Sequence, residues 1–231
     1  MNSFEEQYKI HGLASQRRYP NESLLAFLAE HYFSLTQRER QKIQILELGC
    51  GSGANLWMLA REGFSVWGID SSATGLSFCQ TILNQWNVQA NLTLGNMTVL
   101  PYASASFDAI VDVVSMQHLT WLQHEQALAE IFRVLKPGGR FFSFHLGAGS
   151  SAFTASQAYK MDDVTLDNIP AGYPLAGNGP TAFLSAEQYQ RMANEAGLID
   201  VIVERQLRSY ALSSLMVEYL IFTARKPNVT D

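Results

Sequence analysis

A glycine-rich stretch preceded by an acid is the part of this sequence best suited to hold a ligand. Residues 47–55 read Glu-Leu-Gly-Cys-Gly-Ser-Gly-Ala-Asn, between an apolar, β-branched run at 43–48 and a helical pattern that starts at Asn55. Glycine lets the backbone turn sharply and lets a ligand approach where a Cβ would block it. The free N–H groups of a following helix favour a carboxylate or phosphate. Taken alone, the glycines fit a purely structural turn equally well.

An acid after the next predicted strand makes a nucleoside the favoured ligand. Asp70 ends the apolar run at 65–70, about twenty residues beyond the glycines. A carboxylate at that point can accept hydrogen bonds from both hydroxyls of a ribose. The glycine spacing is G-x-G-x-G with Glu47 two residues earlier, whereas the dinucleotide fingerprint is G-x-G-x-x-G. The pattern therefore predicts a nucleoside-containing ligand other than a dinucleotide.

Strand and helix patterns alternate around these residues. Alternation of this kind predicts a parallel sheet with helices on both faces. The last two strands are separated by only about ten residues, which favours antiparallel pairing at one edge. We therefore expect an α/β fold with a seven-stranded sheet, mostly parallel, with an antiparallel C-terminal edge strand. Strand patterns lie at 43–48, 65–69, 91–94, 107–114, 140–145, 201–207 and 217–224, and helical patterns at 22–33, 55–59, 75–85, 125–135 and 185–196.

Further motifs extend the pattern to the predicted fourth and fifth strands. Gly95-Asn96-Met97 follows the third strand, Ser-Phe-Asp-Ala-Ile-Val at 106–111 opens the fourth, and Arg-Val-Leu-Lys-Pro-Gly-Gly-Arg at 133–140 precedes the fifth. With the glycine stretch and Asp70, these motifs resemble those of class I S-adenosylmethionine-dependent methyltransferases, of the type that acts on small molecules. The resemblance covers 43–145 and implies a Rossmann-like fold with S-adenosylmethionine as cofactor. The C-terminal hairpin matches in architecture only.

The resemblance also implies a role for each motif. In the family, the acid and the glycine stretch hold the methionine part of the cofactor, and the acid after the second strand binds the ribose. The polar residue after the third strand meets the adenine amine. This sequence has Asn96 where aspartate is common, and its amide oxygen can still accept that hydrogen bond. The expected cofactor-binding residues are Glu47, Gly49, Cys50, Gly51, Asn55, Asp70, Ser71, Asn96, Met97 and Val113.

Two histidines at the carboxyl ends of predicted strands are the candidates for catalysis. His118 follows the fourth strand and His145 ends the fifth, on the rim where open α/β sheets bind ligands. Imidazole suits a base near neutral pH, which matters when the accepting atom must lose a proton. Methyl transfer from a sulfonium can also proceed largely by positioning. Relatives often use a histidine at the position of His118 for packing or in the cofactor shell, so both interpretations stay open.

Two segments outside the sheet are expected to complete the acceptor site. Residues 16–20 read Gln-Arg-Arg-Tyr-Pro, and similar arms in relatives fold over the cofactor with a cation and an aromatic ring. A solvated basic pair is the alternative for this arm. The Gly- and Pro-rich stretch from Leu146 to Thr181 is too long for a routine connection and predicts a lid. We expect Tyr159, Met161, Tyr173 and Phe183 to form its apolar walls, and Tyr8, Tyr19 and Tyr173 to bind substrate.

The bulk properties narrow the partners. A net charge of -5 and a pI near 5.5 give no general attraction to nucleic acid or anionic lipid. The Asn-Pro-Pro-aromatic motif of amino-methylating DNA enzymes does not follow the fourth strand. Cys50 and Cys79 lack a metal-ligand spacing, so we expect no metal. No signal-like start and no apolar run of membrane-spanning length occur, which predicts a cytoplasmic protein without a membrane partner.

The expected organisation is one domain over residues 1–231. It consists of an N-terminal helical cap (1–42), a cofactor-binding core (43–145), a substrate lid (146–184) and a C-terminal helix with a hairpin (185–231). The expected function is methyl transfer from S-adenosylmethionine to an oxygen, nitrogen or carbon atom of a small molecule. A protein or RNA methyltransferase, or a catalytically silent cofactor-binding protein of the same fold, is the alternative. The sequence leaves the oligomeric state open.

Overall fold

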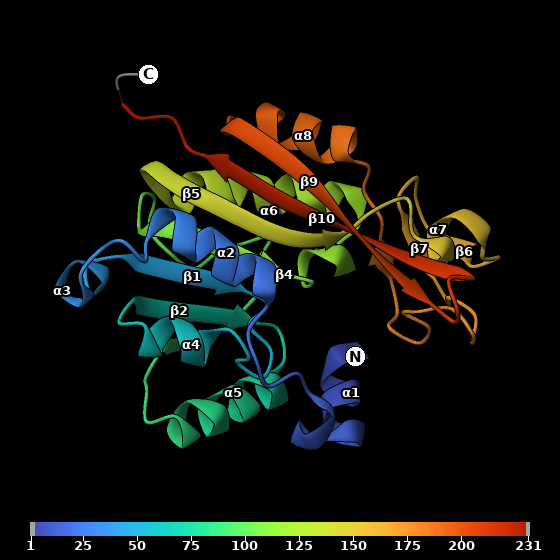
Figure 1. Ribbon diagram of the computed structural model, residues 1–231, viewed down its shortest axis with the longest axis horizontal. Coiled ribbons are helices and arrows are strands. Elements are labelled where there is room, and N and C mark those ends of the chain that lie inside the picture. The colour runs from blue at the N-terminus through green and yellow to red at the C-terminus, as the bar shows by residue number, and fades with distance from the viewer. Residues whose placement is uncertain (1–2, 230–231) are drawn as a thin grey trace.

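The computed structural model describes residues 3–229 and is built around a seven-stranded sheet with helices on both faces (Figure 1). The strand order is β3-β2-β1-β4-β5-β10-β9. The first five strands of this order pair in parallel, and β10 runs antiparallel to both β5 and β9. The predicted fold class is confirmed, with the antiparallel strand second from the edge. The strands are β1 (Gln44–Leu48), β2 (Ser65–Asp70), β3 (Asn91–Leu94), β4 (Phe107–Val113), β5 (Leu135–Leu146), β9 (Ile199–Tyr210) and β10 (Leu215–Arg225).

The strand order reverses direction at β1, and this reversal places the ligand crevice. From β1 the chain runs outward to β2 and β3, and then returns to place β4 on the other side of β1. Connections that leave neighbouring strands in opposite directions open a crevice beyond the carboxyl ends of those strands. The glycine stretch directly follows β1, and Asp70 is the last residue of β2. Both predicted ligand-binding features therefore lie at the crevice.

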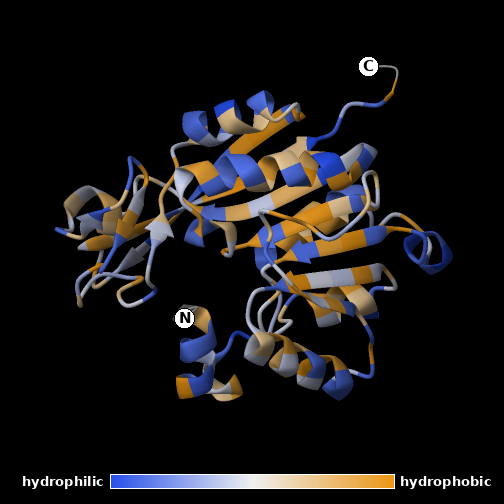
Figure 2. Cartoon of the chain, turned by 180° about the vertical axis from the view of Figure 1, so that it is seen from behind, coloured by the Kyte–Doolittle hydropathy of each residue, from blue (hydrophilic) through white to orange (hydrophobic). Residues whose placement is uncertain are grey.

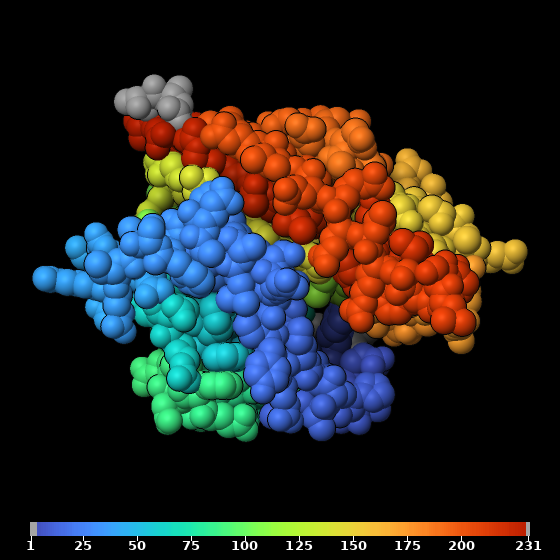
Figure 3. Space-filling view, viewed as in Figure 1, coloured from blue at the N-terminus to red at the C-terminus, as the bar shows by residue number. Residues whose placement is uncertain are grey.

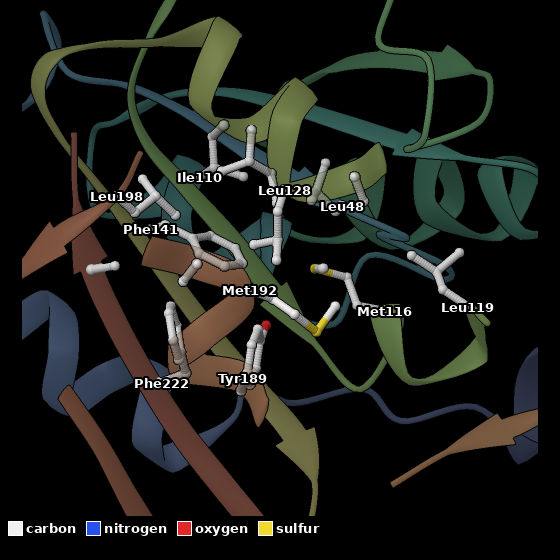
Figure 4. Close-up of a cluster of buried hydrophobic side chains, with 14 of the residues drawn as sticks. Leu48, Ile110, Met116, Leu119, Leu128, Phe141, Tyr189, Met192, Leu198 and Phe222 are labelled. Carbon is white, nitrogen blue, oxygen red and sulfur yellow. The ribbon is translucent and has the colours of Figure 1, made fainter. Parts of the chain in front are cut away.

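Two buried apolar clusters attach the helices to the sheet. One contains Leu28 and Ile82 and joins α2, α4 and α5 to one face, and the other contains Leu128 and Tyr189 and joins α6 and α8 to the opposite face. Figure 4 shows Tyr189 beside Phe222 in the second cluster, and their ring centroids are 4.2 Å apart. The helices are α1 (Ser3–His11), α2 (Glu22–His31), α3 (Gln37–Arg40), α4 (Leu56–Arg61), α5 (Ala73–Gln85), α6 (Trp121–Val134) and α8 (Ala186–Glu195), with short 3₁₀ turns η1 (Leu13–Ser15) and η2 (Met116–His118).

Local signals explain where these elements begin. The Asn21 side chain accepts a hydrogen bond from the backbone N–H of Leu24 at 3.0 Å, so it caps the N-terminus of α2. Thr120 and Ser185 begin α6 and α8 with capping boxes. Figure 2 shows hydrophobic residues concentrated in the strands of the central sheet, whereas the helices mix both classes. No helix between residues 3 and 229 has the length and apolar character needed to cross a membrane.

The segment between β5 and α8 is more ordered than the sequence predicts. It contains a short helix and three short strands that form a separate sheet in the order β6-β7-β8. Leu166, Ile169 and Phe183 form a small apolar cluster of their own there with Leu146 and Val217. Runs of two or three strand residues carry too little periodicity to be read from sequence. These elements are α7 (Ser151–Ala155), β6 (Tyr159–Lys160), β7 (Thr165–Asp167) and β8 (Thr181–Ala182).

Candidate functional site

A cavity of about 450 Å³ lies at the carboxyl ends of β1, β2 and β4. Ligand pockets of 300–1,000 Å³ are typical for drug-sized molecules, so this cavity has the volume for one nucleoside-sized ligand. Its walls come from the glycine stretch, the ends of the strands, η2, the N-terminal arm and the turn before β8. The lining residues are Phe4, Tyr8, Gln16, Arg17, Glu47, Gly49, Cys50, Gly51, Ser52, Ala54, Ile69, Asp70, Ser71, Gly95, Asn96, Met97, Val113, Val114, Ser115, His118, Leu119 and Pro180.

The glycine stretch forms the floor of the cavity, and three of its residues have a backbone conformation that other residues rarely adopt. Gly49 has φ 58°, Gly51 has φ 51° and Gly53 has φ 84°. A Cβ on Gly49 would overlap the side chain of Ser115, and a Cβ on Gly51 would lie 2.6 Å from the Tyr8 hydroxyl. The glycines therefore allow both the turn and the close approach of the arm and of the residues that follow β4.

Glu47 is an almost completely buried acid in the wall of the cavity. Its carboxylate is only 3% exposed, and Oε1 accepts a hydrogen bond from Asn55 Nδ2 at 2.6 Å. The other oxygen, Oε2, has no hydrogen-bond partner among the residues described. Burial raises the pKa of Glu47 to about 8, although Asn55 and the nearby Arg17 act in the opposite direction. Glu47 therefore has a buried oxygen available for a cationic ligand.

Asp70 connects the end of β2 to the glycine stretch. Its Oδ2 accepts a hydrogen bond from the backbone N–H of Gly51 at 2.8 Å, and Oδ1 accepts one from the N–H of Ser72, also at 2.8 Å. Burial raises the pKa of Asp70, and these N–H donors partly oppose the shift. Each carboxylate oxygen can accept a second hydrogen bond. Asp70 can therefore orient the loop and still receive donors from a ligand.

The far wall of the cavity follows β3. Gly95, Asn96 and Met97 line it together with Ser71. The Asn96 side-chain oxygen accepts a hydrogen bond from the backbone N–H of Thr98 at 3.0 Å, which closes a local turn. A carbonyl oxygen has two lone pairs, so one remains for a donor in the cavity. The wall thus combines one amide with the apolar side chain of Met97.

The two candidate histidines occupy different environments. His118 lines the cavity, its Nδ1 is 3.0 Å from the carbonyl oxygen of Pro180, and its Nε2 is 3.1 Å from Gln117 Nε2. Because a carbonyl only accepts, Nδ1 carries the proton and Nε2 accepts from the amide. Burial lowers the pKa of His118, partly opposed by the Pro180 carbonyl and Asp112, so the ring is neutral at neutral pH.

His145 lies outside the cavity, contrary to what its position at a strand end indicates. It is fully buried beneath the rim, with Nδ1 2.8 Å from the Leu146 carbonyl oxygen and Nε2 3.0 Å from Nε2 of His124. The β5 strand continues through Leu146, so the His145 side chain points between the sheet and α6 and α8. This position does not support a role in methyl transfer.

The N-terminal arm covers the cavity, as the arm motif indicates, but with a different set of side chains. Phe4, Tyr8, Gln16 and Arg17 line the cavity, and the Phe4 ring meets the His118 ring edge-on with centroids 4.4 Å apart. Burial lowers the pKa of Arg17, and Glu47 partly offsets this effect. Gln16 and Arg17 belong to the arm motif at 16–20, whereas no sequence pattern singles out Phe4.

A carboxylate on α1 fastens this arm to the sheet domain. Glu5 Oε2 accepts from the Ser72 hydroxyl at 2.5 Å, and Oε1 accepts from the Thr74 hydroxyl at 2.6 Å. These hydroxyls, with Lys9 at 3.0 Å, lower the pKa of Glu5 to about 2. In Figure 3 the blue N-terminal segment accordingly lies against the green atoms of α5. We call this set of contacts the α1 clasp.

The remaining predicted residues lie outside the cavity wall. Asn55 is fully buried behind Glu47. Tyr19 is 67% exposed and meets Trp57 edge-on, and the Tyr173 hydroxyl donates to the Ala155 carbonyl at 3.1 Å within the 146–184 segment. Sequence reasoning missed Ser115, whose hydroxyl donates to the Leu48 carbonyl at 2.7 Å. Ser115 follows β4 closely, and the same kind of position after a strand end is the reason why the sequence predicts His118 at the site.

Comparison with known proteins identifies a family for this core. Residues 45–139 match the family profile described as "Methyltransferase domain". The demethylmenaquinone methyltransferase of Tropheryma whipplei is 37% identical over 98 residues, which is 42% of this chain and 39% of that protein. An S-adenosyl-L-methionine-dependent Diels-Alderase of Talaromyces variabilis is 27% identical over 165 residues, 68% of this chain and 53% of that protein. The chain thus spans about half or less of the length of these curated relatives.

Among solved structures, the 1,6-didemethyltoxoflavin-N1-methyltransferase of Burkholderia thailandensis, with bound substrate and S-adenosylhomocysteine, superposes with a TM-score of 0.65. The sequences are 15% identical, and the alignment covers 98% of this chain and 88% of that one. At this identity the likeness concerns the fold. It extends over the whole sheet, including the C-terminal hairpin beyond the profile match.

Proposed function

Because the chain belongs to the class I S-adenosylmethionine-dependent methyltransferases, we propose that it transfers a methyl group from S-adenosylmethionine to a small-molecule acceptor. The observation that carries the proposal is the cavity at the switch point of the sheet. Its floor is the glycine stretch, its acids are Glu47 and Asp70, and its mouth is narrowed by α1 and the turn at Pro180. This partly open cavity of about 450 Å³ has the volume for the cofactor, and an acceptor has to reach it past α1 and the turn at Pro180, which favours a small molecule over a protein or RNA chain.

The polar groups of the cavity fit the parts of the cofactor. The unpartnered Oε2 of Glu47 provides an acceptor for the ammonium group, and Arg17 provides a cation for the carboxylate. The remaining lone pairs of Asp70 suit the ribose hydroxyls, and Asn96 with Met97 suits the adenine. When bound, S-adenosylmethionine supplies a methyl group that is already activated on a sulfonium. The chain then has to orient the acceptor and exclude water.

We assign His118 an orienting role in this reaction. Both of its nitrogens have partners, and the ring is wedged between Phe4 and the carbonyl of Pro180. To act as a base, His118 Nε2 would first have to give up its hydrogen bond from the Gln117 amide and accept a proton from the acceptor instead. Its ring instead forms one wall of the space between the cofactor loop and α1, which fixes where an acceptor lies. Positioning of this kind can supply much of the rate in an in-line displacement.

The experiment that tests the function is a screen of small metabolites for release of S-adenosylhomocysteine by the purified protein. Asp70→Ala is the matched variant, because it removes the acceptor for two ribose hydrogen bonds of about 1 kcal/mol each. We expect cofactor affinity to fall at least about tenfold in calorimetry. Asp163→Ala, at a site 95% exposed in the 146–184 segment, is the control and should leave affinity unchanged.

Two outcomes would contradict the proposal in different ways. Unchanged affinity in Asp70→Ala would contradict the assignment of the cavity as the cofactor site. The protein could instead bind the cofactor tightly and convert a small molecule without releasing S-adenosylhomocysteine. That result would contradict methyl transfer and would resemble the activity named for the Diels-Alderase relative. Methylation of a protein or RNA in preference to every small molecule would contradict the acceptor class.

A further inference from the structure

Glu47 lines the cavity, and one of its oxygens has no hydrogen-bond partner among the described residues although the residue is almost completely buried. Oε1 accepts from Asn55 Nδ2 at 2.6 Å, and Oε2 makes no hydrogen bond to any residue in the range 3–229. A buried polar atom without a partner is costly, and a buried charge more so. The free state of the protein can reduce this cost by keeping a proton on Oε2.

Asn55 determines which oxygen is left free. Its side-chain Oδ1 accepts from the backbone N–H of Asn21 at 3.0 Å, so its Nδ2 must be the atom that faces Glu47. An N–H group donates, and therefore Oε1 is held as an acceptor in every protonation state of the carboxyl. Only Oε2 is available for a proton or for a ligand. Asn21 begins α2, so this orientation is fixed from the end of the N-terminal arm.

Charged groups of both signs surround Glu47 in the free protein. Asp70 on β2 and Asp112 on β4 repel a carboxylate, and Arg17 on the arm attracts one. Tyr8 on α1 also faces this cluster and stays a neutral phenol, since burial and Asp70 raise its pKa. Burial is the largest influence on Glu47 and raises its pKa to about 8. Most molecules of the free protein therefore carry a protonated Glu47 at neutral pH.

We propose that the ammonium group of the cofactor displaces a proton from Glu47 when it binds at Oε2, and that Asn55 is the positioning residue for this exchange. The inference rests on the proposed function. In the exchange, the carboxylic acid O–H bond breaks, its proton passes to solvent, and the resulting carboxylate accepts from the ammonium group. Binding is tightest where Glu47 is already ionised, so affinity rises with pH.

The test is calorimetric titration of the whole protein with S-adenosylhomocysteine, which carries the same ammonium group. Between pH 6.0 and 7.5 we expect affinity to increase roughly 25-fold, from the ratio of ionised fractions for a group with pKa about 8. Titration at pH 7 in two buffers of different ionisation enthalpy should show close to one proton released. Methylthioadenosine, which has the nucleoside but no amino acid portion, is the ligand control and should release none.

Two variants separate the parts of the exchange. Glu47→Gln keeps the acceptor for Asn55 and cannot ionise, so its affinity for S-adenosylhomocysteine should vary less than about twofold over the same pH range. Asn55→Ala removes a donor that lowers the pKa of Glu47, so the midpoint of the affinity profile should move to higher pH. A merely structural role of Asn55 would instead reduce affinity equally at every pH.

Each outcome bears on a different claim. Binding of S-adenosylhomocysteine without proton release, or with the same pH dependence in Glu47→Gln, overturns this inference and leaves the proposed function standing. Failure of both S-adenosylhomocysteine and methylthioadenosine to bind the folded wild-type protein overturns the proposed cofactor itself. Equal proton release with both ligands assigns the proton to a group outside the amino acid subsite and also overturns the inference.

Discussion

Glu47→Gln should stabilise the ligand-free protein, and the effect should grow with pH. The pKa of Glu47 is raised from 4.5 to about 8 in the folded state, so folding favours the protonated acid. For such a group, stability is fully present below the unfolded pKa and is lost as pH rises toward the folded pKa. Glutamine stays neutral and retains the hydrogen bond from Asn55. The substitution therefore removes a cost that the wild type incurs only above about pH 4.5.

The size of the effect follows from the two pKa values. Proton linkage lowers the free energy of unfolding of the wild type by less than about 1 kcal/mol at pH 5 and by about 3 kcal/mol at pH 7. The variant should therefore gain about 2 to 3 kcal/mol relative to wild type between these pH values. For a chain of 231 residues this corresponds to a Tm difference that widens by roughly 5–10 °C.

The assay is urea unfolding at pH 5, 6 and 7, followed by tryptophan fluorescence and circular dichroism to check that the probes coincide. Glu204→Gln, at an exposed site on the edge strand β9, is the matched control and should show no widening gap. Saturating S-adenosylhomocysteine should add stability to the wild type above that of the variant, because only the carboxylate pairs with the ligand. A stability difference between wild type and Glu47→Gln that is constant from pH 5 to 7 would refute the reasoning.

Three further predictions concern the walls of the cavity. Glu5→Gln weakens the α1 clasp and should speed dissociation of S-adenosylhomocysteine about threefold or more in stopped-flow measurements, whereas the exposed neighbour variant Glu6→Gln should not. His118→Asn should lower turnover less than about tenfold with cofactor affinity within twofold; a loss of a hundredfold or more would identify a base instead. The 146–184 segment should be cleaved by protease in the free protein and protected when S-adenosylhomocysteine and acceptor are both bound, and protection that ligands leave unchanged would make it a connector only.

The sheet and the cofactor half of the cavity could be predicted from sequence because their determinants are local. The turn after β1 requires Gly49 and Gly51 at positive φ, and Asp70 ends the adjacent parallel strand, so chain order alone brings the three together. The helices and strands of the core carry strong periodicity, and their predicted ranges match the structure within a few residues.

The acceptor half of the cavity, formed by α1, η2 and the turn before β8, depends on contacts between segments far apart in the sequence. Local sequence patterns do not predict such contacts. The α1 clasp joins Glu5 to residues 72–74, and His118 meets Pro180 across 62 positions. His145 illustrates the limit: its place at a strand end predicts the rim, but the alternation of β5 turns its side chain toward α6, where it pairs with His124. Side chains alternate between the two faces of a strand, so the sequence predicts the face on which His145 lies only when the register of β5 is known.

The cofactor half and the acceptor half of the cavity therefore tolerate amino-acid substitutions to different degrees. A side chain at Gly49 would overlap Ser115, so the cofactor half has little freedom to vary without loss of the turn. The acceptor half is built from Phe4 on α1, His118 on η2 and Pro180 before β8, which are joined by a ring contact between Phe4 and His118 and a hydrogen bond between His118 and Pro180. Substitutions in the turn before β8 can reshape that wall without touching the glycine stretch, whereas α1 also carries Tyr8 beside Gly51 and Glu5 of the α1 clasp. We therefore expect exchange of the turn before β8 to alter acceptor preference while cofactor affinity changes little.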